Sequence, residues 1–302
     1  MQQLLVSEFF KETLSGLIVQ SRLAGDLLVH QRVPVITYPY EWSFQMLKAA
    51  AQVQLHVLKV CLENGFILKD GSGFNTLYHQ GQMVFVDLLS VDYYKPGQVW
   101  EGYAQFYRHF LYPLMLQSKF AAPFQGWWRG EMNGISARAV YKLLGWRALT
   151  VPGGFRHVLL QNLLSGVDTA SINTGPKRAT AVRKNPAMPK GVLLGFIRSL
   201  QKTVERMEQK KCRSVWSHYM DTNTYREDDQ AQKEVFIKEY LQKETPRQLV
   251  DLGCNTGHYT RLAAPLVQRV VAVDYDSHCI DKLYLSLESD SNLKKKVVPM
   301  VG

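Results

Sequence analysis

Long apolar runs are missing from this sequence. No segment approaches the roughly 20 apolar residues that a bilayer-spanning helix requires, and no signal peptide opens the chain. Cysteine is also scarce, because four scattered cysteines form no C-x-x-C pair, and His278 beside Cys279 is too little for a metal site. We therefore expect free thiols in a reducing cytosol, no membrane association and no metal centre. The cysteines are Cys61, Cys212, Cys254 and Cys279.

Positive charge is concentrated in one segment. The formal net charge is +10, and residues 177–213 hold eleven Lys or Arg against two acids, Glu205 and Glu208. A basic stretch of this kind can bind nucleic acid or another acidic partner. Few aromatic side chains interleave with the charges, which disfavours stacking on bases. We expect a solvated linker followed by the outer face of a helix, and no nucleic-acid partner.

The chain is long enough for two domains. Its 302 residues, with 46% hydrophobic and 21% charged residues, fit a globular protein with a sizeable core. We predict a mainly helical α+β N-terminal domain at 1–165, a basic linker rich in Pro and Gly at 166–191, an amphipathic helix at 192–212 and a partial α/β domain at 213–302.

The N-terminal region has clear local signals. Residues 33–38 are typical of an extended strand, and apolar residues at helical spacing predict a helix at 44–62 that ends at Asn64-Gly65. A β-hairpin is expected at 76–87. Aromatic residues three and four apart between 98 and 116 indicate a helix that packs into the core, in preference to a ligand cage.

A glycine turn near the end of the chain is the strongest functional signal. The segment 248–257 reads QLVDLGCNTG, an apolar run that leads to Asp251 and then to Gly253 and Gly257. This order predicts a strand, a tight turn and the start of a helix. Glycine lets the backbone N–H groups of such a turn approach a ligand closely.

A second acid follows at a suitable distance. The run 269–273 predicts a buried parallel strand, and Asp274 stands at its carboxyl end, where ligands bind in open α/β sheets. An acid about 20 residues after the turn is placed to accept hydrogen bonds from ribose. Asn255 and His258 occupy positions where the dinucleotide fingerprint needs glycine, so the pattern indicates another nucleoside. The alternative is a strand–turn–helix unit without a ligand.

The glycine turn resembles motif I of class I S-adenosylmethionine-dependent methyltransferases, with Asn255 in place of the middle glycine. This resemblance implies a Rossmann-like sheet and S-adenosyl-L-methionine as the cofactor. It implies that Asp251, Gly253, Asn255 and Gly257 lie on the methionine side of the cofactor and that Asp274 binds its ribose.

A second constellation lies in the N-terminal domain. Asp70 and Asn75 stand five residues apart in a loop, and Asp87 ends the strand that follows. This order resembles that of protein kinases, in which a catalytic Asp is followed by an Asn and then by a metal-binding Asp. Leu68 stands in place of the usual His, and no glycine-rich phosphate loop precedes the set. A remote kinase-like lobe is therefore one interpretation, and a simple turn shaped by Asp70 and Asn75 is the other.

Several separated blocks resemble the nodulation-protein-like group of bacterial class I methyltransferases. The resemblance implies a methyltransferase that follows a long N-terminal domain and a chain truncated at both ends, with the sheet's first three strands only. We therefore expect an open edge on the first strand, no visible catalytic residue, an unknown methyl acceptor and no turnover by this chain. A non-catalytic scaffold or pseudoenzyme is the alternative. The blocks are YPYEWSF at 38–44, LKDGSGFN at 68–75, FVDLLS at 85–90, YAQFYRHFL at 103–111 and VDLGCNTG at 250–257.

Overall fold

The computed structural model describes residues 12–160, 188–210 and 227–302. Cys212, most of the expected linker and the expected start of the last domain lie outside these ranges. Residues 190 and 191, which we expected in the linker, belong to a helix.

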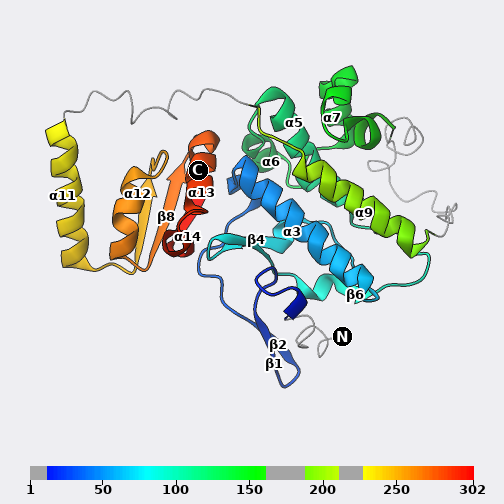
Figure 1. Ribbon diagram of the computed structural model, residues 1–302, viewed down its shortest axis with the longest axis horizontal. Helices are drawn as coiled ribbons and strands as arrows, with labels where there is room; N and C mark the ends of the chain where they lie inside the picture. The colour runs from blue at the N-terminus through cyan, green and yellow to red at the C-terminus, as the bar shows by residue number, and fades with distance from the viewer. Residues whose placement is uncertain (1–11, 161–187, 211–226) are drawn as a thin grey trace.

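The N-terminal part combines helices with three two-stranded sheets (Figure 1). Its elements, with η for 3-10 and π turns, are β1 (Ser21–Ala24), β2 (Leu27–His30), η1 (Pro39–Glu41), α3 (Phe44–Glu63), β3 (Phe66–Leu68), η2 (Gly73–Asn75), β4 (Thr76–His79), β5 (Gln82–Phe85), η3 (Leu88–Ser90), β6 (Val91–Tyr93), α4 (Tyr103–Phe106), η4 (Tyr107–Leu111), α5 (Tyr112–Phe120), α6 (Gln125–Gly130), α7 (Ala137–Leu144), η5 (Gly145–Thr150), η6 (Phe155–Leu160) and α9 (Lys190–Glu205).

Helix α3 is the central element of this part, and it confirms the helix predicted at 44–62. Ser43 caps its amino end by accepting a hydrogen bond from the Met46 N–H at 3.5 Å. The chain leaves the helix at Asn64, and Gly65 takes a φ of +85° that a residue with a Cβ rarely adopts.

The hairpin expected at 76–87 is also present, as the antiparallel pair β4–β5. The strand expected at 33–38 is absent, and β1 and β2 form a hairpin just before it. Pro34 lacks a backbone donor for a sheet. Thr37 is held instead by its hydroxyl, which accepts bonds from Trp42 Nε1 at 3.0 Å and the Tyr78 N–H at 3.3 Å.

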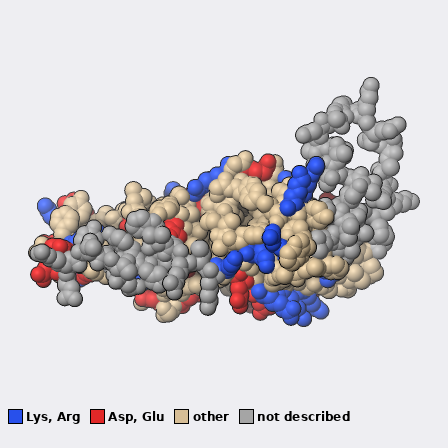
Figure 2. All heavy atoms as spheres, turned by 90° about the horizontal axis from the view of Figure 1, so that it is seen from above, with Lys and Arg blue, Asp and Glu red and all other residues tan. Residues whose placement is uncertain are grey.

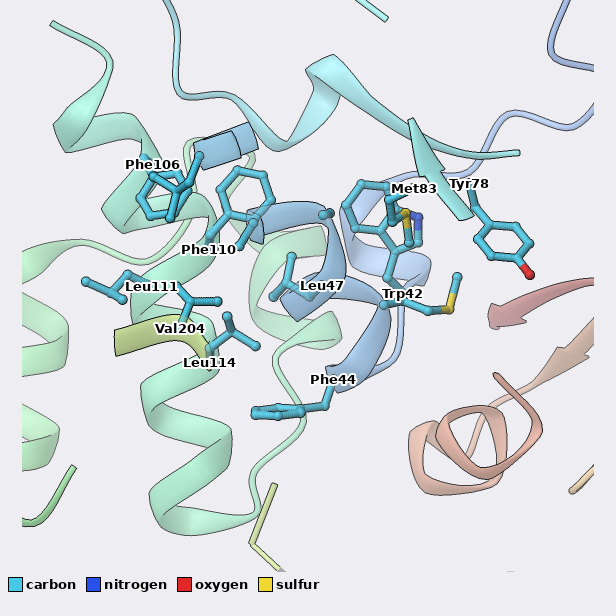
Figure 3. Close-up of a cluster of buried hydrophobic side chains, with 14 of the residues drawn as sticks. Trp42, Phe44, Leu47, Tyr78, Met83, Phe106, Phe110, Leu111, Leu114 and Val204 are labelled. Carbon is cyan, nitrogen blue, oxygen red and sulfur yellow. The ribbon is translucent and has the colours of Figure 1, made fainter. Parts of the chain in front are cut away.

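The N-terminal core confirms the packing role that we predicted for the aromatic segment. Figure 3 shows Phe106 beside Phe110 and Phe110 near Leu47 of α3, with Val204 of α9 beside Leu114. Helix α9 begins two residues before the predicted helix and ends at Glu205 instead of 212. Its buried face packs on α3, so it belongs to the N-terminal core.

The C-terminal part is a parallel three-stranded sheet in the order β7-β8-β9, with helices around it. The strands predicted before the glycine turn and at 269–273 are confirmed as β7 and β8, and β9 is the third of the three strands that we expected. Of the described strands β7 lies at the edge, and Leu252 is 78% exposed, as expected for an open first strand. The elements are α11 (Glu227–Glu244), β7 (Gln248–Leu252), α12 (His258–Ala263), η8 (Ala264–Leu266), β8 (Arg269–Asp274), α13 (Ser277–Leu287), α14 (Ser291–Lys296) and β9 (Val297–Val301).

The two parts meet along α13 and β9. Figure 1 shows α13 beside the amino end of α3, and the Gln45 N–H of α3 donates to Asp281 Oδ1 of α13 at 2.8 Å. Arg129 of α6 donates to the carbonyl oxygens of Val301 and Gly302 at the end of β9, at 3.1 and 3.4 Å. The N-terminal part therefore covers one side of the sheet, while β7 lies away from it.

None of the described helices combines the length and the apolar character that crossing a bilayer would need.

Candidate cofactor site

The glycine turn joins β7 to α12 at the carboxyl edge of the sheet. The N–H groups of Gly253 and Cys254 donate to the Val273 carbonyl of β8, at 2.8 and 3.1 Å, which fixes the turn to the neighbouring strand. Gly253 and Gly257 have φ values of +73° and +87°. Three left-handed residues occur within five positions, because Asn255 also has a φ of +51°.

The left-handed conformation explains why asparagine replaces the middle glycine at position 255. Asparagine tolerates positive φ better than other residues with a Cβ. Its Oδ1 accepts a hydrogen bond from the Thr256 N–H at 2.6 Å, which closes a local side-chain turn. Asn255 thus keeps the backbone course that a glycine would allow.

Asp274 connects the end of β8 to the glycine turn. Its Oδ2 accepts a hydrogen bond from the Asn255 N–H at 2.8 Å, and its Oδ1 accepts one from the Asp276 N–H at 2.8 Å. Only 8% of Asp274 is exposed. Each carboxylate oxygen has a second lone pair, so the oriented carboxylate keeps acceptor capacity for ribose hydroxyls.

The two turn glycines are needed for different reasons. A Cβ on Gly253 would meet no atom within 4 Å, so this glycine faces open space. A Cβ on Gly257 would collide with the Leu283 side chain of α13. Gly253 therefore fits the role of close approach to a ligand, whereas Gly257 allows α12 to pack against α13.

Asp251 lies on the α11 side of the turn. Its Oδ2 accepts a hydrogen bond from the Thr260 hydroxyl at 2.6 Å. Burial raises the pKa of Asp251, while the Thr260 bond and nearby Lys233 oppose this shift. Asp251 also lines a mostly apolar cavity of about 200 Å³ between α11, β7 and α12. Asp251 therefore forms a hydrogen bond to α12 within the protein. This bond is additional to the cofactor contact that the sequence predicts for Asp251.

Helix α11 is fixed to the start of α12 by polar contacts. His258 Nε2 lies 2.8 Å from Glu234 Oε1, and Lys233 Nζ lies 4.2 Å from the centre of the Tyr259 ring.

Cys254, inside the turn, is buried, and burial raises the pKa of its thiol. Its thiol is therefore not activated as a nucleophile.

The structure brings together two of the three residues in the kinase-like set. Asn75 Nδ2 donates to Asp87 Oδ2 at 3.2 Å, across the ends of the β4–β5 hairpin. Asp70 is exposed, and its backbone carbonyl accepts a bond from Gln54. Among the described residues, no cluster of three His, Cys, Asp or Glu side chains is placed to hold a metal ion.

The described Lys and Arg residues do not form one continuous patch on the face that Figure 2 draws. Figure 2 shows Lys and Arg in separate groups with Asp and Glu between them, on the face that it draws. In the described portion of the basic segment, Arg198 lies 3.7 Å from Glu63. This distribution is in keeping with the solvated helix face that the sequence predicts.

Sequence reasoning missed three residues that organise these sites. His109 Nδ1 accepts a bond from the Gly73 N–H at 3.2 Å, and burial lowers the pKa of His109 to about 4, so the neutral ring holds the loop before β4. Asp281 and Arg129 join the two parts of the chain. Their partners are at least 36 residues away along the chain, and no local pattern reports such contacts.

Comparison with known proteins gives one informative similarity. No family model and no solved structure matches the chain. Nodulation protein NoeA of Rhizobium meliloti (strain 1021) is 32% identical over 262 residues, which cover 85% of this chain and 54% of the relative. The chain therefore spans about half the length of this curated relative. The expected resemblance to nodulation proteins is confirmed, and the similarity supports a nodulation-protein-like family.

Proposed function

We propose that the C-terminal part of this chain binds S-adenosyl-L-methionine as part of a class I methyltransferase. One observation carries the proposal: the buried Asp274 carboxylate at the end of β8 accepts the Asn255 N–H of the glycine turn, beside the open space at Gly253. This arrangement places a ribose acceptor and an approachable backbone on the same edge of a parallel sheet. The proposal covers cofactor binding and assigns no catalytic residue or methyl acceptor.

The ribose and the methionine portion of the cofactor are expected at different places in this site. The ribose hydroxyls are donors, and the free lone pairs of Asp274 are the matching acceptors. The methionine portion is expected along the turn from Asp251 to Gly257, where Gly253 leaves room for close contact. The similarity to NoeA supports the nodulation-protein-like part of the resemblance and leaves methyl transfer as part of the proposal.

Asp274→Ala is expected to weaken S-adenosylmethionine binding by about 1–3 kcal/mol, because it removes charged acceptors of ribose hydrogen bonds. Isothermal titration of the 302-residue chain with S-adenosylmethionine measures this loss. Asp92→Ala, which removes an exposed carboxylate of β6, is the matched control and should leave binding unchanged. Equal affinity of Asp274→Ala and the wild type would remove Asp274 from the site.

A second candidate function is a nucleotide-binding pseudoenzyme or scaffold role for the N-terminal part. The favouring observation is the Asn75–Asp87 contact at the ends of the hairpin, with β3 paired to β6 beside it. Amide and carboxylate oxygens are the ligands that magnesium prefers. The sequence supplies no glycine-rich phosphate loop, so the candidate role is binding without phosphotransfer.

Magnesium-dependent ATP binding by the whole chain tests this second candidate. We expect Asp87→Asn to weaken magnesium-ATP binding at least about tenfold, because one anionic metal ligand is lost. Titration with and without magnesium measures it, and Asp70→Asn shows whether the exposed Asp70 takes part. Absence of magnesium-dependent binding in the wild type would reduce the Asn75–Asp87 pair to a structural contact.

A further inference from the structure

A cavity of about 280 Å³ lies where the N-terminal part meets the amino ends of β8 and β9. Its walls come from the segment 31–35, from the β4–β5 hairpin and from the starts of the two parallel strands. Asp274 stands at the opposite end of β8, so this cavity is separate from the candidate cofactor site.

The lining of this cavity is basic. Arg32, Arg269 and Lys295 all contribute to it, and no Asp or Glu does. Arg269 is half-buried, whereas Arg32 and Lys295 are exposed. Three cations around one small space repel each other, and the repulsion grows where water is partly excluded.

These three cations have no ion-pair partners within the described ranges. Arg269 Nη1 donates to Gln248 Oε1 over a long distance of 3.4 Å. Unpaired, converging cations raise the local positive potential, which favours a bound anion. Arginine also has the planar fork of donors that matches the oxygens of phosphate.

His79 supplies a second and independent sign of a ligand. It lines the same cavity, and its Nε2 is buried without a hydrogen-bond partner among the described residues. Burial, together with Arg269, lowers the pKa of His79. A buried ring nitrogen without a partner is costly, and a small turn of the His79 ring toward the cavity would let this nitrogen donate to a bound oxyanion.

Three glutamine amides complete the donor set around the cavity. Gln31, Gln80 and Gln268 contribute to the lining, and each amide has two N–H donors. The volume lies at the lower limit of small-molecule pockets, which begin at roughly 300 Å³. A compact ligand therefore fits better than a large one.

We propose that this cavity binds the phosphate group of a small molecule, with Arg269 and His79 as the inner donors and Arg32 and Lys295 at the mouth. The site joins the segment 31–35 to the sheet, so a bound phosphate holds the two parts of the chain together. Free inorganic phosphate and a phosphate ester share this chemistry, and the test must separate them.

Pyrophosphate, inorganic phosphate and glycerol phosphate are the probes, each titrated into the 302-residue chain at constant ionic strength set with sodium chloride. We expect saturable binding of one equivalent of a probe and a rise in the unfolding temperature with its concentration. Tighter binding of glycerol phosphate than of both inorganic probes would identify a phosphate ester as the ligand. Tighter binding of the inorganic probes would identify a free ion. Absence of saturable binding by all three probes would overturn the proposal.

Arg269→Gln is expected to weaken probe binding by about tenfold to hundredfold, because a charge-assisted donor is lost. Arg138→Gln, which removes an exposed charge of α7, is the matched control and should bind as the wild type does. Should Arg269→Gln fail to fold, Lys295→Gln at the exposed mouth is expected to weaken binding in the same direction. Equal losses in the Arg138 and Arg269 variants would show non-specific charge attraction and overturn the site.

Discussion

Gly253→Val is expected to abolish detectable binding of S-adenosylmethionine while the chain remains folded. The φ of +73° at Gly253 is unfavourable for a β-branched residue, at a cost of about 1–3 kcal/mol. The larger effect concerns the ligand, because the open space beside Gly253 is where the proposed cofactor meets the backbone. A valine side chain would fill that space and keep the methionine portion from the turn.

Gly25→Val is the matched control for this variant. Gly25, in the turn between β1 and β2, also has a positive φ (+59°) and no atom within 4 Å of a Cβ. Both variants should lose a similar amount of stability, measured by urea unfolding, and only Gly253→Val should lose binding in isothermal titration. Normal cofactor binding by Gly253→Val would place the ligand elsewhere or remove it from this turn.

Elements with a strong local pattern could be predicted from the sequence. Helix α3 follows from its apolar stripe between Ser43 and Asn64, and β7 and β8 follow from short apolar runs that end in Asp251 and Asp274. The parallel order β7-β8-β9 agrees with the expected first half of the sheet. In these segments, periodicity and turn residues favour the same local structure.

Contacts between distant segments could not be predicted in this way. The sequence marks Gly257 as a turn residue, yet its lack of a side chain is needed because Leu283 lies against it. The prediction of a strand at 33–38 was wrong. Thr37 is held there by hydrogen bonds from the Trp42 side chain and the Tyr78 backbone, which no local pattern indicates. The cavity around Arg269 and His79 likewise depends on segments that meet only in the folded chain.

Asp281→Ala is expected to lower the free energy of unfolding by about 2 kcal/mol, through the contact between the two parts of the chain. Asp281 is 5% exposed, and it accepts the Gln45 N–H at the amino end of α3 at 2.8 Å. Alanine would leave that buried N–H without an acceptor and remove a negative charge from the positive end of the helix.

Asp281→Asn separates the hydrogen bond from the charge. The amide oxygen can still accept from Gln45, so this variant is expected to lose less than about 1 kcal/mol. Burial raises the pKa of Asp281, although the bonds from Ser43 and Gln45 oppose the shift. The charged form is therefore held in the folded chain at a cost in solvation, and asparagine avoids that cost.

The raised pKa of Asp281 determines whether its contribution to the free energy of unfolding grows or falls with pH. Because the folded chain holds the Asp281 proton more tightly than the unfolded chain, its contribution to stability is fully present below the ordinary pKa of an aspartate. That contribution is lost as the pH rises through the folded-state pKa. The stability advantage of the wild type over Asp281→Asn should therefore shrink as the pH rises above about 4, the ordinary pKa of an aspartate.

Urea unfolding of the wild type, Asp281→Ala and Asp281→Asn at several pH values measures both effects. Asp26→Ala, in the exposed turn between β1 and β2, is the control and should stay within about 0.5 kcal/mol of the wild type. The assigned role would be contradicted if Asp281→Ala were as stable as this control. It would also be contradicted if the difference in unfolding free energy between the wild type and Asp281→Asn grew as the pH rises. The expected result would show that one carboxylate of α13 caps α3 and thereby holds the parallel sheet against the N-terminal part.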